Sequence, residues 1–519
     1  MGHIEGLNRN QIMMTDLESL ISDNNECRVI DAFCEKLDMK NMGFTHAEAK
    51  EEGRPSYPPQ VLLKLYLYGL LNSICSSGKL AKEAQRNIEV MWLLNGLQPS
   101  KRTLCYFKEN NKKALKQVFK EFNRFYRSIG LFGKSTVALD SVKVKANNSK
   151  KRNHNKKTVE RTISKTEARI DEYMAALEEA DKNDNYNEEL NLSKEQIKGI
   201  IDKLEAKKAR YEDLKEQLEE HEETQISETD ADSRCMKQGS GKGMDVSYNT
   251  QVVTEEKNKM IVDFETTNSG SDKGHLVEMG ERAKDFLETE EINLLADTGY
   301  HNGKEMLEAE KSGITCVIPK GKAGNQTEDK GYSRDKFTYD ENNDVYICPN
   351  NQTLKKMRDQ KDSNGDSSHV YANYSACASC PHRAKCTKRK FREILRKPFQ
   401  TEVDKLDKRF LKMKGEYKKR QEIIEHQFGT IKWVWGFDRY YTKGIDFADA
   451  ENALRFTAYN LRRAINIMGV KRLIELAEAY LSVLFKSFFV ELNVLYYCLF
   501  KKRKLSAVCS TISRSFCTV

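Results

Sequence analysis

The sequence predicts an α/β protein whose core is a mixed sheet flanked by helices, joined to an all-helical N-terminal domain and interrupted by two insertions. Three patterns indicate this fold class. Apolar helical runs fill much of residues 1–130, short apolar strands alternate with helices over residues 131–470, and a heptad repeat occupies residues 159–222. The second insertion, residues 321–400, is polar and Gly- and Asn-rich over most of its length and holds several cysteines, so we expect mainly loop there.

Length and composition exclude several classes of protein. The chain has 519 residues, of which 39% are hydrophobic and 32% charged, which excludes a membrane-embedded protein. The formal net charge is +9, but residues 159–230 alone carry −11, which leaves +20 for the rest. A surface this basic indicates a polyanionic partner such as nucleic acid; a solvated Lys-rich surface is the alternative.

The N-terminal domain is expected to be a set of packed helices. Residues 61–71 are apolar on most sides and predict a buried helix, and further helices are expected over residues 80–97 and 103–129. Residues 99–103 have the composition of a turn and helix cap between the last two. This pattern is compatible with a DNA-binding helix-turn-helix, but helices that pack without touching DNA predict it equally well.

Two acidic residues come directly after short apolar strands of the predicted core. Asp140 follows residues 135–139, and Asp297 follows residues 292–296. Ligand-binding groups gather at the carboxyl ends of strands in α/β sheets, so we expect both side chains at a site. Other strands are expected at residues 246–254, 260–264 and 315–318, and helices at residues 273–287, 401–432 and 448–468.

A third acidic candidate, Glu425, lies on the long charged helix predicted near the end of the core. Any one acid among 78 means little, but the three together fit a two-metal phosphodiester site. Such a site needs carboxylates to hold two divalent cations ~3.5–4 Å apart, one at the attacking oxygen and one at the leaving oxygen. Hard oxygen ligands favour Mg²⁺, with Mn²⁺ as the related choice.

The first insertion is predicted to be an antiparallel helical hairpin with a coiled-coil seam. Residues 181–185 are polar and separate its two helical runs. We interpret the hairpin as a dimerisation or DNA-spacing arm, or as an inert insertion. The apolar residues that repeat every seven positions are Ile163, Ile170 and Leu177 in the first run and Ile197, Leu204, Tyr211 and Leu218 in the second.

Four cysteines of the second insertion have metal-ligand spacing. Cys377, Cys380 and Cys386 form a C-x₂-C-x₅-C pattern, and Cys348 lies upstream. Four thiolates with a close pair suit a closed, structural Zn²⁺ site, and basic residues around them make a DNA-facing knuckle plausible. The alternative is a set of free thiols in a reducing compartment.

The segments around the three acids resemble DDE transposases of bacterial insertion sequences. Residues 138–147 (ALDSVKVKAN) are similar to the first-aspartate motif of that family, and residues 295–300 (LADTGY) to its second. The family's Tyr–Arg–Glu–Lys signature is matched by Tyr417, Arg420, Glu425 and Lys432, although four residues separate Arg420 from Glu425 where many relatives have three. Including weaker matches at residues 59–97, 229–234 and 248–251, the similarity spans about residues 50 to 470.

The resemblance implies an RNase H-like core in which Asp140, Asp297 and Glu425 bind the metal ions. A water molecule would attack the phosphodiester at the end of the element, and the freed 3′-hydroxyl would attack the target DNA. The expected partners are double-stranded DNA, at the element ends and at the target, and a second copy of the chain in a homodimer. Residues expected to contact DNA are Lys143, Lys145, Tyr417, Arg420 and Lys432.

Two other functions stay open: a non-catalytic DNA-binding relic of a transposase, and a two-metal nuclease that cuts without joining. The tail, residues 471–519, contains an apolar stretch at residues 480–500. Charged and polar residues interrupt it, which favours a packed or partner-binding helix over a membrane span. The chain opens without a signal-peptide pattern, so we expect a cytoplasmic, nucleoid-associated bacterial protein.

Overall fold

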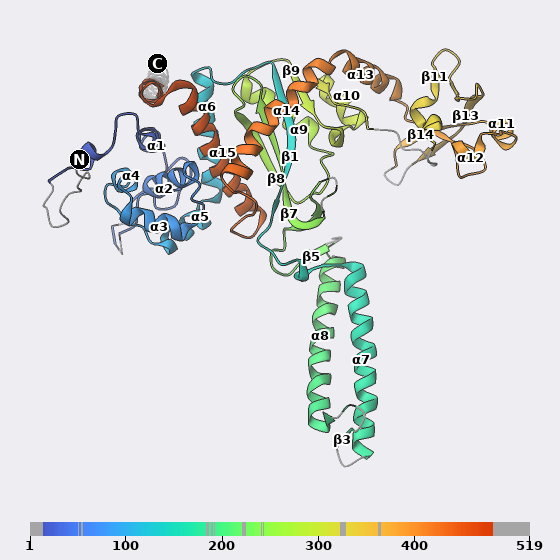
Figure 1. The fold of residues 1–519 in the computed structure, drawn as a ribbon, viewed down its shortest axis with the longest axis horizontal. Helices are drawn as coiled ribbons and strands as arrows, with labels where there is room; N and C mark the ends of the chain where they lie inside the picture. Colours follow the sequence, from blue (N-terminus) through green and yellow to red (C-terminus); the bar gives the residue numbers. More distant parts are fainter. Residues whose placement is uncertain are drawn as a thin grey trace, which may run out of the picture. The chain divides into compact units, whose positions relative to one another are not determined.

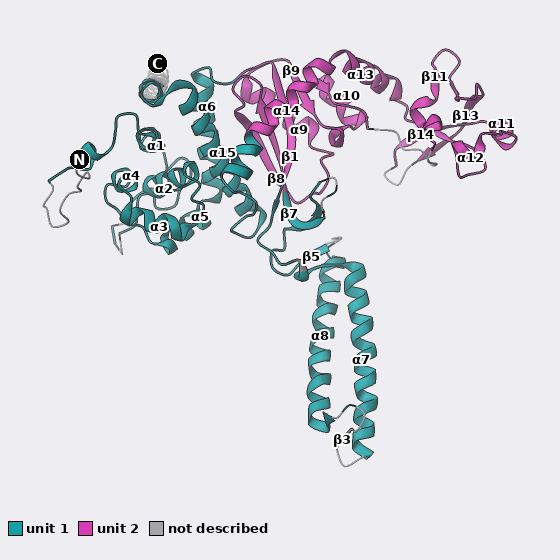
Figure 2. Ribbon diagram, viewed as in Figure 1, with its two compact units in different colours: residues 1–132, 143–248, 427–519 teal, residues 133–142, 249–426 magenta. Residues whose placement is uncertain are grey.

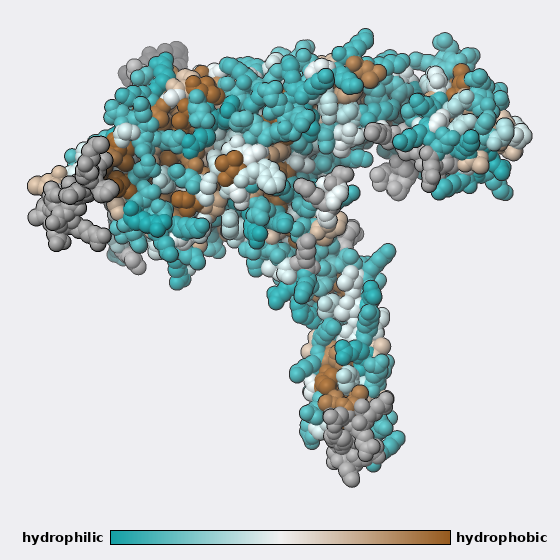
Figure 3. All heavy atoms as spheres, viewed as in Figure 1, coloured by the Kyte–Doolittle hydropathy of each residue, from teal (hydrophilic) through white to brown (hydrophobic). Residues whose placement is uncertain are grey.

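The protein forms two compact units in its computed structural model (Figure 2). Unit 1 comprises Met1–Phe132, Lys143–Tyr248 and Gln427–Val519, and unit 2 comprises Gly133–Val142 and Asn249–His426. On the face seen in Figure 3, hydrophilic residues cover most of the surface. The structure describes residues 14–49, 51–52, 55–182, 186–187, 190, 192–220, 225–239, 241, 243–321, 329–361 and 365–480.

The N-terminal part of unit 1 is helical, as the sequence predicted. Two expected helices are each split in two by an asparagine. Asn87 has an extended backbone and accepts hydrogen bonds from the N–H groups of Glu89 and Val90, so it caps a new helix. Asn111 breaks the next run in the same region. The elements are η1 (Glu18–Leu20), α1 (Glu26–Cys34), α2 (Pro59–Leu71), α3 (Ser77–Arg86), α4 (Ile88–Leu93), α5 (Lys101–Asn110) and α6 (Lys112–Ser128).

The helix α15 (Ile445–Met468) belongs to this helical unit rather than to the core in which the sequence analysis placed it. It packs against α6 and α2. Its middle, residues 450–461, is buried on every side, including Glu451 and Arg455, whose side chains form an ion pair 2.6 Å apart. A helix buried all round needs neighbours on all faces, and the N-terminal helices supply them.

A mixed sheet forms the centre of unit 2. Its strand order is β10–β9–β1–β7, and β8 also pairs with β7. The strands β10, β9 and β1 are parallel, whereas β7 and β8 form an antiparallel hairpin. The first residues of β7 pair with β6 in unit 1. The bounds are β1 (Thr136–Lys145), β6 (Arg234–Lys237), β7 (Met244–Glu255), β8 (Ile261–Thr267), β9 (Ile292–Ala296) and β10 (Ile314–Val317).

Two helices, α9 (Leu276–Leu287) and α10 (Gly303–Lys311), pack against this sheet and each other. The helix α9 approaches the strands very closely at Gly280. A Cβ there would lie 2.9 Å from Ile314 Cδ1 and 3.4 Å from Leu294 Cδ2. Any side chain at this position would therefore require the end of the Ile314 side chain to move aside.

The heptad insertion is an antiparallel pair of helices, α7 (Lys156–Lys182) and α8 (Lys194–Glu220), shown side by side in Figure 1. The predicted seam residues Ile197, Leu204 and Leu218 are buried. The chain enters and leaves the hairpin through two paired strands, β2 (Asn153–Asn155) and β5 (Gln225–Ser227). Two short strands, β3 (Tyr186–Asn187) and β4 (Leu192–Ser193), pair near the turn, and the basic segment before α7, predicted as a loop, also contains η2 (Lys150–Arg152).

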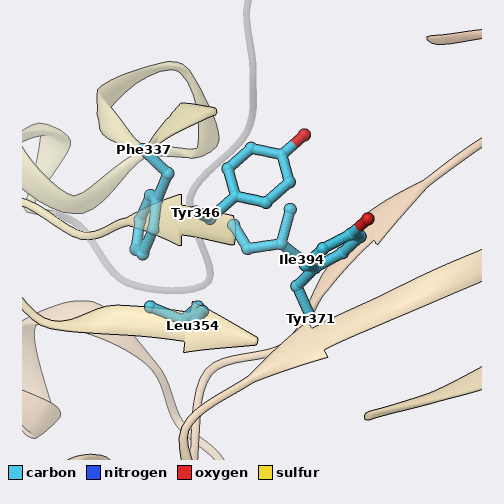
Figure 4. Packing of buried hydrophobic residues seen from close by; sticks show 5 residues of the cluster. All are labelled: Phe337, Tyr346, Leu354, Tyr371 and Ile394. Atoms are coloured by element: carbon cyan, nitrogen blue, oxygen red, sulfur yellow. The ribbon is translucent and has the colours of Figure 1, made fainter. Parts of the chain in front are cut away.

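The second insertion is not mainly loop. It contains a five-stranded antiparallel sheet in the order β11–β12–β13–β14–β15. Its buried core is small and consists of Phe337, Tyr346, Leu354, Tyr371 and Ile394 (Figure 4). The elements are η4 (Lys330–Tyr332), η5 (Arg334–Lys336), β11 (Thr338–Asp340), β12 (Val345–Ile347), β13 (Thr353–Lys361), β14 (Ser367–Ala372), α11 (Tyr374–Ala378), α12 (Arg383–Cys386) and β15 (Ile394–Arg396).

The long charged helix expected over residues 401–432 is broken twice. It consists of α13 (Gln400–Lys412), α14 (Lys414–Phe428) and a π-helical segment, η6 (Gly429–Val434). No helix within the described ranges is long and apolar enough to cross a membrane. The apolar stretch at residues 481–500 lies outside the described residues.

Candidate active site

The strands β1 and β9 bring the first two candidate acids to the same edge of the sheet. They are parallel neighbours, and Leu139 lies opposite Ala296 in their register. Asp140 and Asp297 each come directly after these paired residues. The strand β1 continues to Lys145, so Asp140 lies within it rather than after its end as predicted. Equivalent positions on adjacent parallel strands lie about 4.8 Å apart, so the two aspartates are neighbours across the sheet.

Asp140 lies in a mostly buried position, with 21% of its side chain exposed. Its Oδ2 forms an ion pair with Arg420 Nη2 at 2.9 Å, and its Oδ1 accepts a hydrogen bond from the Ser141 N–H at 2.8 Å. Burial raises the pKa of Asp140 to about 6, against the lowering effect of Arg420 and of the Ser141 N–H. The nearby negative charges of Asp297 and Asp272 raise this pKa further.

Asp297 begins a short helical turn, η3 (Thr298–Tyr300), and caps it. Its Oδ1 accepts a hydrogen bond from the Gly299 N–H at 2.8 Å. This cap fixes the carboxylate against the turn and leaves its other oxygen available to a ligand. Tyr300, at the end of the turn, is buried, and burial followed by the charges of Asp272, Asp140 and Asp297 raises its pKa well above the ordinary value.

A fourth acid, Asp272, lies at the same site and was not among the residues predicted from the sequence. It stands in the loop between β8 and α9 and accepts hydrogen bonds from Asn249 Nδ2 at 3.0 Å and Gln251 Nε2 at 3.2 Å. The segment that contains these two amides was noted above for its family resemblance. Nothing in the spacing of Asp272 links it to them, because 23 and 21 residues separate the partners.

The helix α14 presents its signature residues to different surroundings. Arg420 contacts Asp140 directly, and Tyr417 lies close enough for the charges of Arg420, Asp297 and Asp140 to affect its pKa, which burial raises. Glu425 is exposed, and its carboxylate accepts a hydrogen bond from Gln421 Nε2 at 2.7 Å. Five residues of α-helix turn the chain by about 500°, so Glu425 projects about 140° away from Arg420.

The remaining DNA-contact candidates lie in unit 1. Lys145 Nζ pairs with Asp245 Oδ2 at 3.3 Å, and the backbone of Lys145 bonds with that of Asp438 and Tyr440. The backbone of Lys143 lies in β1, with a partly buried side chain. Lys432 is within the π-helical segment η6. Helical segments of this kind are rare and occur often at functional sites.

The acids fit a divalent cation by their chemistry. Within the described residues, no three or more His, Cys, Asp or Glu side chains form a group that could hold a metal ion as they stand. Mg²⁺ does not need such a cage, because it keeps several waters and commonly takes one or two carboxylates together with phosphate oxygens of a substrate. Asp140 and Asp297 supply a pair of this kind.

The four cysteines predicted as zinc ligands line one small cavity of about 30 Å³ in the second insertion. None of them is in a disulfide. Burial raises the pKa of Cys386, Arg392 lowers it, and the nearby Cys377, Cys348 and Cys380 raise it. The Gln352 N–H donates to Cys348 Sγ at 3.3 Å.

Two family models match the chain. Residues 347–465 match a model described as "Transposase DDE domain", and residues 15–110 match one described as "Transposase domain (DUF772)". These matches indicate a DDE-type transposase of an insertion sequence. No curated protein and no solved structure matches the chain.

The two transposase matches cover different parts of the molecule. The DDE-domain match includes the four cysteines and the signature residues on α14 and η6, whereas Asp140 and Asp297 precede it in the chain. The other match covers most of the N-terminal helices. The family resemblance inferred from the motifs is thereby confirmed, and the matches support transposition of DNA as the general function.

Proposed function

We propose that the protein binds the ends of its insertion sequence and catalyses metal-dependent phosphodiester hydrolysis followed by strand transfer. The observation that supports this proposal is that Asp140, within β1, and Asp297, directly after β9, follow residues that lie opposite each other on adjacent parallel strands. The sheet order β10–β9–β1–β7, with β8 also paired to β7, supports an RNase H-like core. This chemistry requires access to DNA, so the proposed location is the bacterial cytoplasm.

Asp140, Asp297 and Glu425 are the proposed ligands of Mg²⁺ or Mn²⁺. When bound, such an ion polarises the phosphodiester and lowers the pKa of a coordinated water. Arg420 holds Asp140 in place by its ion pair and also provides positive charge next to the position expected for the DNA backbone. Tyr417, one helical turn earlier, borders the same site.

Glu425 requires a change of helix register to join the two aspartates. In an α-helix, Arg420 and Glu425 point in different directions, but residues five apart lie on nearly the same face of a π-helical turn. A π-helical segment begins at Gly429, only four positions after Glu425. The exposed hydrogen bond from Gln421 to Glu425 costs only about 0.5–1.5 kcal/mol to break.

DNA is the proposed macromolecular partner, and a homodimer the proposed assembly, since two element ends must be joined. Lys143, Lys145 and Lys432 are proposed to contact the phosphate backbone, together with Tyr417 and Arg420. Because released counterions then provide much of the affinity, binding should weaken by orders of magnitude when the salt concentration is raised several-fold. Binding that ignored salt would contradict these contacts.

We also propose a structural Zn²⁺ bound by Cys348, Cys377, Cys380 and Cys386. Their common cavity of about 30 Å³ is large enough for one small ion. The sheet that carries them has five buried core residues in its hydrophobic cluster. Small scaffolds with so little buried apolar surface usually depend on a metal ion or disulfides for their stability.

The experiment that tests the catalytic proposal is cleavage of a labelled DNA duplex that carries the ends of the element. The intact protein should cut in Mg²⁺ and join the freed 3′ ends to target DNA. Asp297→Asn should bind the duplex but cut at least about 10³-fold more slowly, because one carboxylate of the site is lost. Asp285→Asn on α9, an exposed aspartate of the same unit, is the matched control and should cut normally.

The other possible results of this experiment distinguish the alternative functions. Binding without cutting by the intact protein would identify a non-catalytic relic. Cutting without joining would identify a nuclease. Equal cutting by the intact protein and Asp297→Asn would exclude this carboxylate from the site and overturn the proposal.

A further inference from the structure

A cluster of three charged or titratable side chains borders the turn that follows Asp297. Its centre is Asp407 on α13, whose side chain is only 13% exposed. The Oδ1 of Asp407 forms a hydrogen bond with His301 Nε2 at 2.9 Å, and its Oδ2 accepts one from Lys320 Nζ at 2.7 Å. One carboxylate therefore joins His301, which follows η3, to a lysine that lies beyond β10.

The sheet places Lys320 beside the turn that holds Asp297. The strands β9 and β10 are parallel neighbours, so the segments that follow them leave the sheet at the same edge. Asp297 directly follows β9, and Lys320 is the third residue after β10. The two segments lie against each other, because a Cβ at Gly321 would be 3.2 Å from Cγ2 of Thr298. Lys320 and Asp297 are each one residue away from this close approach.

The ion pair with Asp407 holds Lys320 without enclosing it. Burial alone would raise the pKa of Asp407, but its hydrogen bonds with His301 and Lys320 hold this pKa below the ordinary value, so the carboxylate is ionised. The side chain of Lys320 is 55% exposed, and the bond to Asp407 uses one of the three N–H groups of its ammonium. A second carboxylate, that of Asp404, is 3.8 Å from the same Nζ and already pairs with Arg396 at 2.9 Å.

The position of Lys320 suits a phosphate oxygen better than a purely structural role. An ion pair with so exposed a lysine contributes little to stability, because water screens it. A lysine ammonium binds phosphate as a compact point charge, and that of Lys320 is fixed in direction by Asp407 on α13. Arg420 supplies positive charge at Asp140 on β1, whereas β10 lies on the other side of β9. Lys320 therefore provides positive charge on the second flank of Asp297.

We propose that Lys320 binds a backbone phosphate of the DNA strand that passes the Asp297 turn. This inference rests on the proposed function, because it adds a contact to the same DNA site. Contacts to phosphate fix the position of a protein on DNA without reading its sequence. Lys320 accordingly positions the strand at the candidate active site and contributes to affinity for any sequence at that point.

The first test is acetylation of the lysines in the full-length protein, measured by mass spectrometry with and without a duplex that carries the element ends. Lys311 is the internal control, because it is exposed and precedes β10, whereas Lys320 follows that strand. Bound DNA should slow the acetylation of Lys320 severalfold and leave that of Lys311 unchanged. Equal acetylation of Lys320 with and without bound DNA would overturn the proposal.

Substitutions separate a phosphate contact from a structural ion pair. Lys320→Ala should weaken binding of the duplex by about three- to tenfold and reduce the slope of log affinity against log salt by about 1. Lys320→Arg keeps the charge and should restore the slope, whereas Lys311→Ala should leave it unchanged. If Lys320→Ala lowers the unfolding temperature but leaves the slope as it is, Lys320 only pairs with Asp407, and the proposal is wrong.

The results also separate this contact from the proposed function. If the intact protein neither binds nor cuts the duplex, the proposed function fails, and the contact at Lys320 fails with it. If the intact protein binds and cuts the duplex, but neither the acetylation of Lys320 nor the salt slope of Lys320→Ala changes, the proposed function stands and the contact is excluded.

Discussion

The two sheets of unit 2 are stabilised in different ways. In the central sheet, β9 is buried along nearly its whole length and β7 has ten consecutive buried residues. In the small sheet, β13 has one buried residue among nine. The first sheet is buried along β7 and β9, with apolar and hydrogen-bonded polar side chains alike, whereas the second has exposed polar strands and a core of five residues beside four cysteines. The two sheets have similar numbers of strands, but the helices α9 and α10 pack against the central sheet, and we attribute the difference in burial to this covering.

The largest expected effect concerns the cysteines of the small sheet. Cys380→Ser, or removal of metal by a chelator, should unfold this sheet and leave the central one folded, because structural zinc sites contribute about 10–16 kcal/mol of apparent binding free energy. Hydrogen exchange in β13 and β14, compared with β9, measures this. Cys105→Ser, at an exposed cysteine, is the control. Unchanged protection of β14 after chelation would refute the zinc proposal.

A core substitution in each sheet tests whether their stabilities are independent. Leu294→Ala in β9 and Leu354→Ala in β13 both remove a fully buried side chain, and each should cost about 2–5 kcal/mol. We expect Leu294→Ala to lower the unfolding temperature of the central sheet. Leu354→Ala should abolish protection only in the small sheet, because it removes one of five core residues. Loss of protection in both sheets from either change would mean that they unfold as one.

The pH dependence of the central sheet should report on Asp140. Its folded pKa is raised to about 6 from 3.8, so the folded state binds the proton more tightly. This stabilisation is fully present below pH 3.8 and is lost as the pH rises through 6, by about 3 kcal/mol at most. Thermal unfolding of metal-free protein between pH 4 and 7, compared with Asp140→Asn, isolates the contribution. Metal-dependent cleavage should rise over the same pH range, because the ionised carboxylate binds the cation.

The smallest effect is expected for single basic residues. Lys145→Ala at the end of β1 should weaken DNA binding and reduce the slope of log affinity against log salt by about 1. Lys361→Ala, at the end of β13 in the small sheet, is the comparison and should change this slope less. A larger change of slope for Lys361→Ala than for Lys145→Ala would indicate that DNA contacts the small sheet rather than the central one.

The sequence predicted what depends on local patterns. The bounds of β9, the hairpin of β7 and β8, the helical insertion and the position of Asp297 after its strand agree with the structure, whereas β1 continues to Lys145 and Asp140 lies within it. These features follow from apolar runs and heptads, which are local. The metal-binding and DNA-binding roles of the individual residues stay predictions.

The sequence could not predict features that depend on distant contacts or on polar strands. The strand β13 reads TLKKMRDQK, without the alternation that marks a half-buried strand, so its segment was predicted as loop. Asp272 joins the site only through amides more than 20 residues away in the chain. The direction in which Glu425 projects depends on the α-helical geometry of α14, which changes to π-helical geometry in η6 four residues later.

The pairing of β2 with β5 makes the long hairpin a removable module. The chain leaves the body of unit 1 and returns to it on neighbouring strands, with Asn155 opposite Gln225. A two-residue turn between these positions would close the gap, since adjacent strands are only about 4.8 Å apart. Shortening or lengthening the arm at this junction is therefore expected to leave β1 and β7 undisturbed, which makes the junction a suitable place to attach a reporter or a further domain.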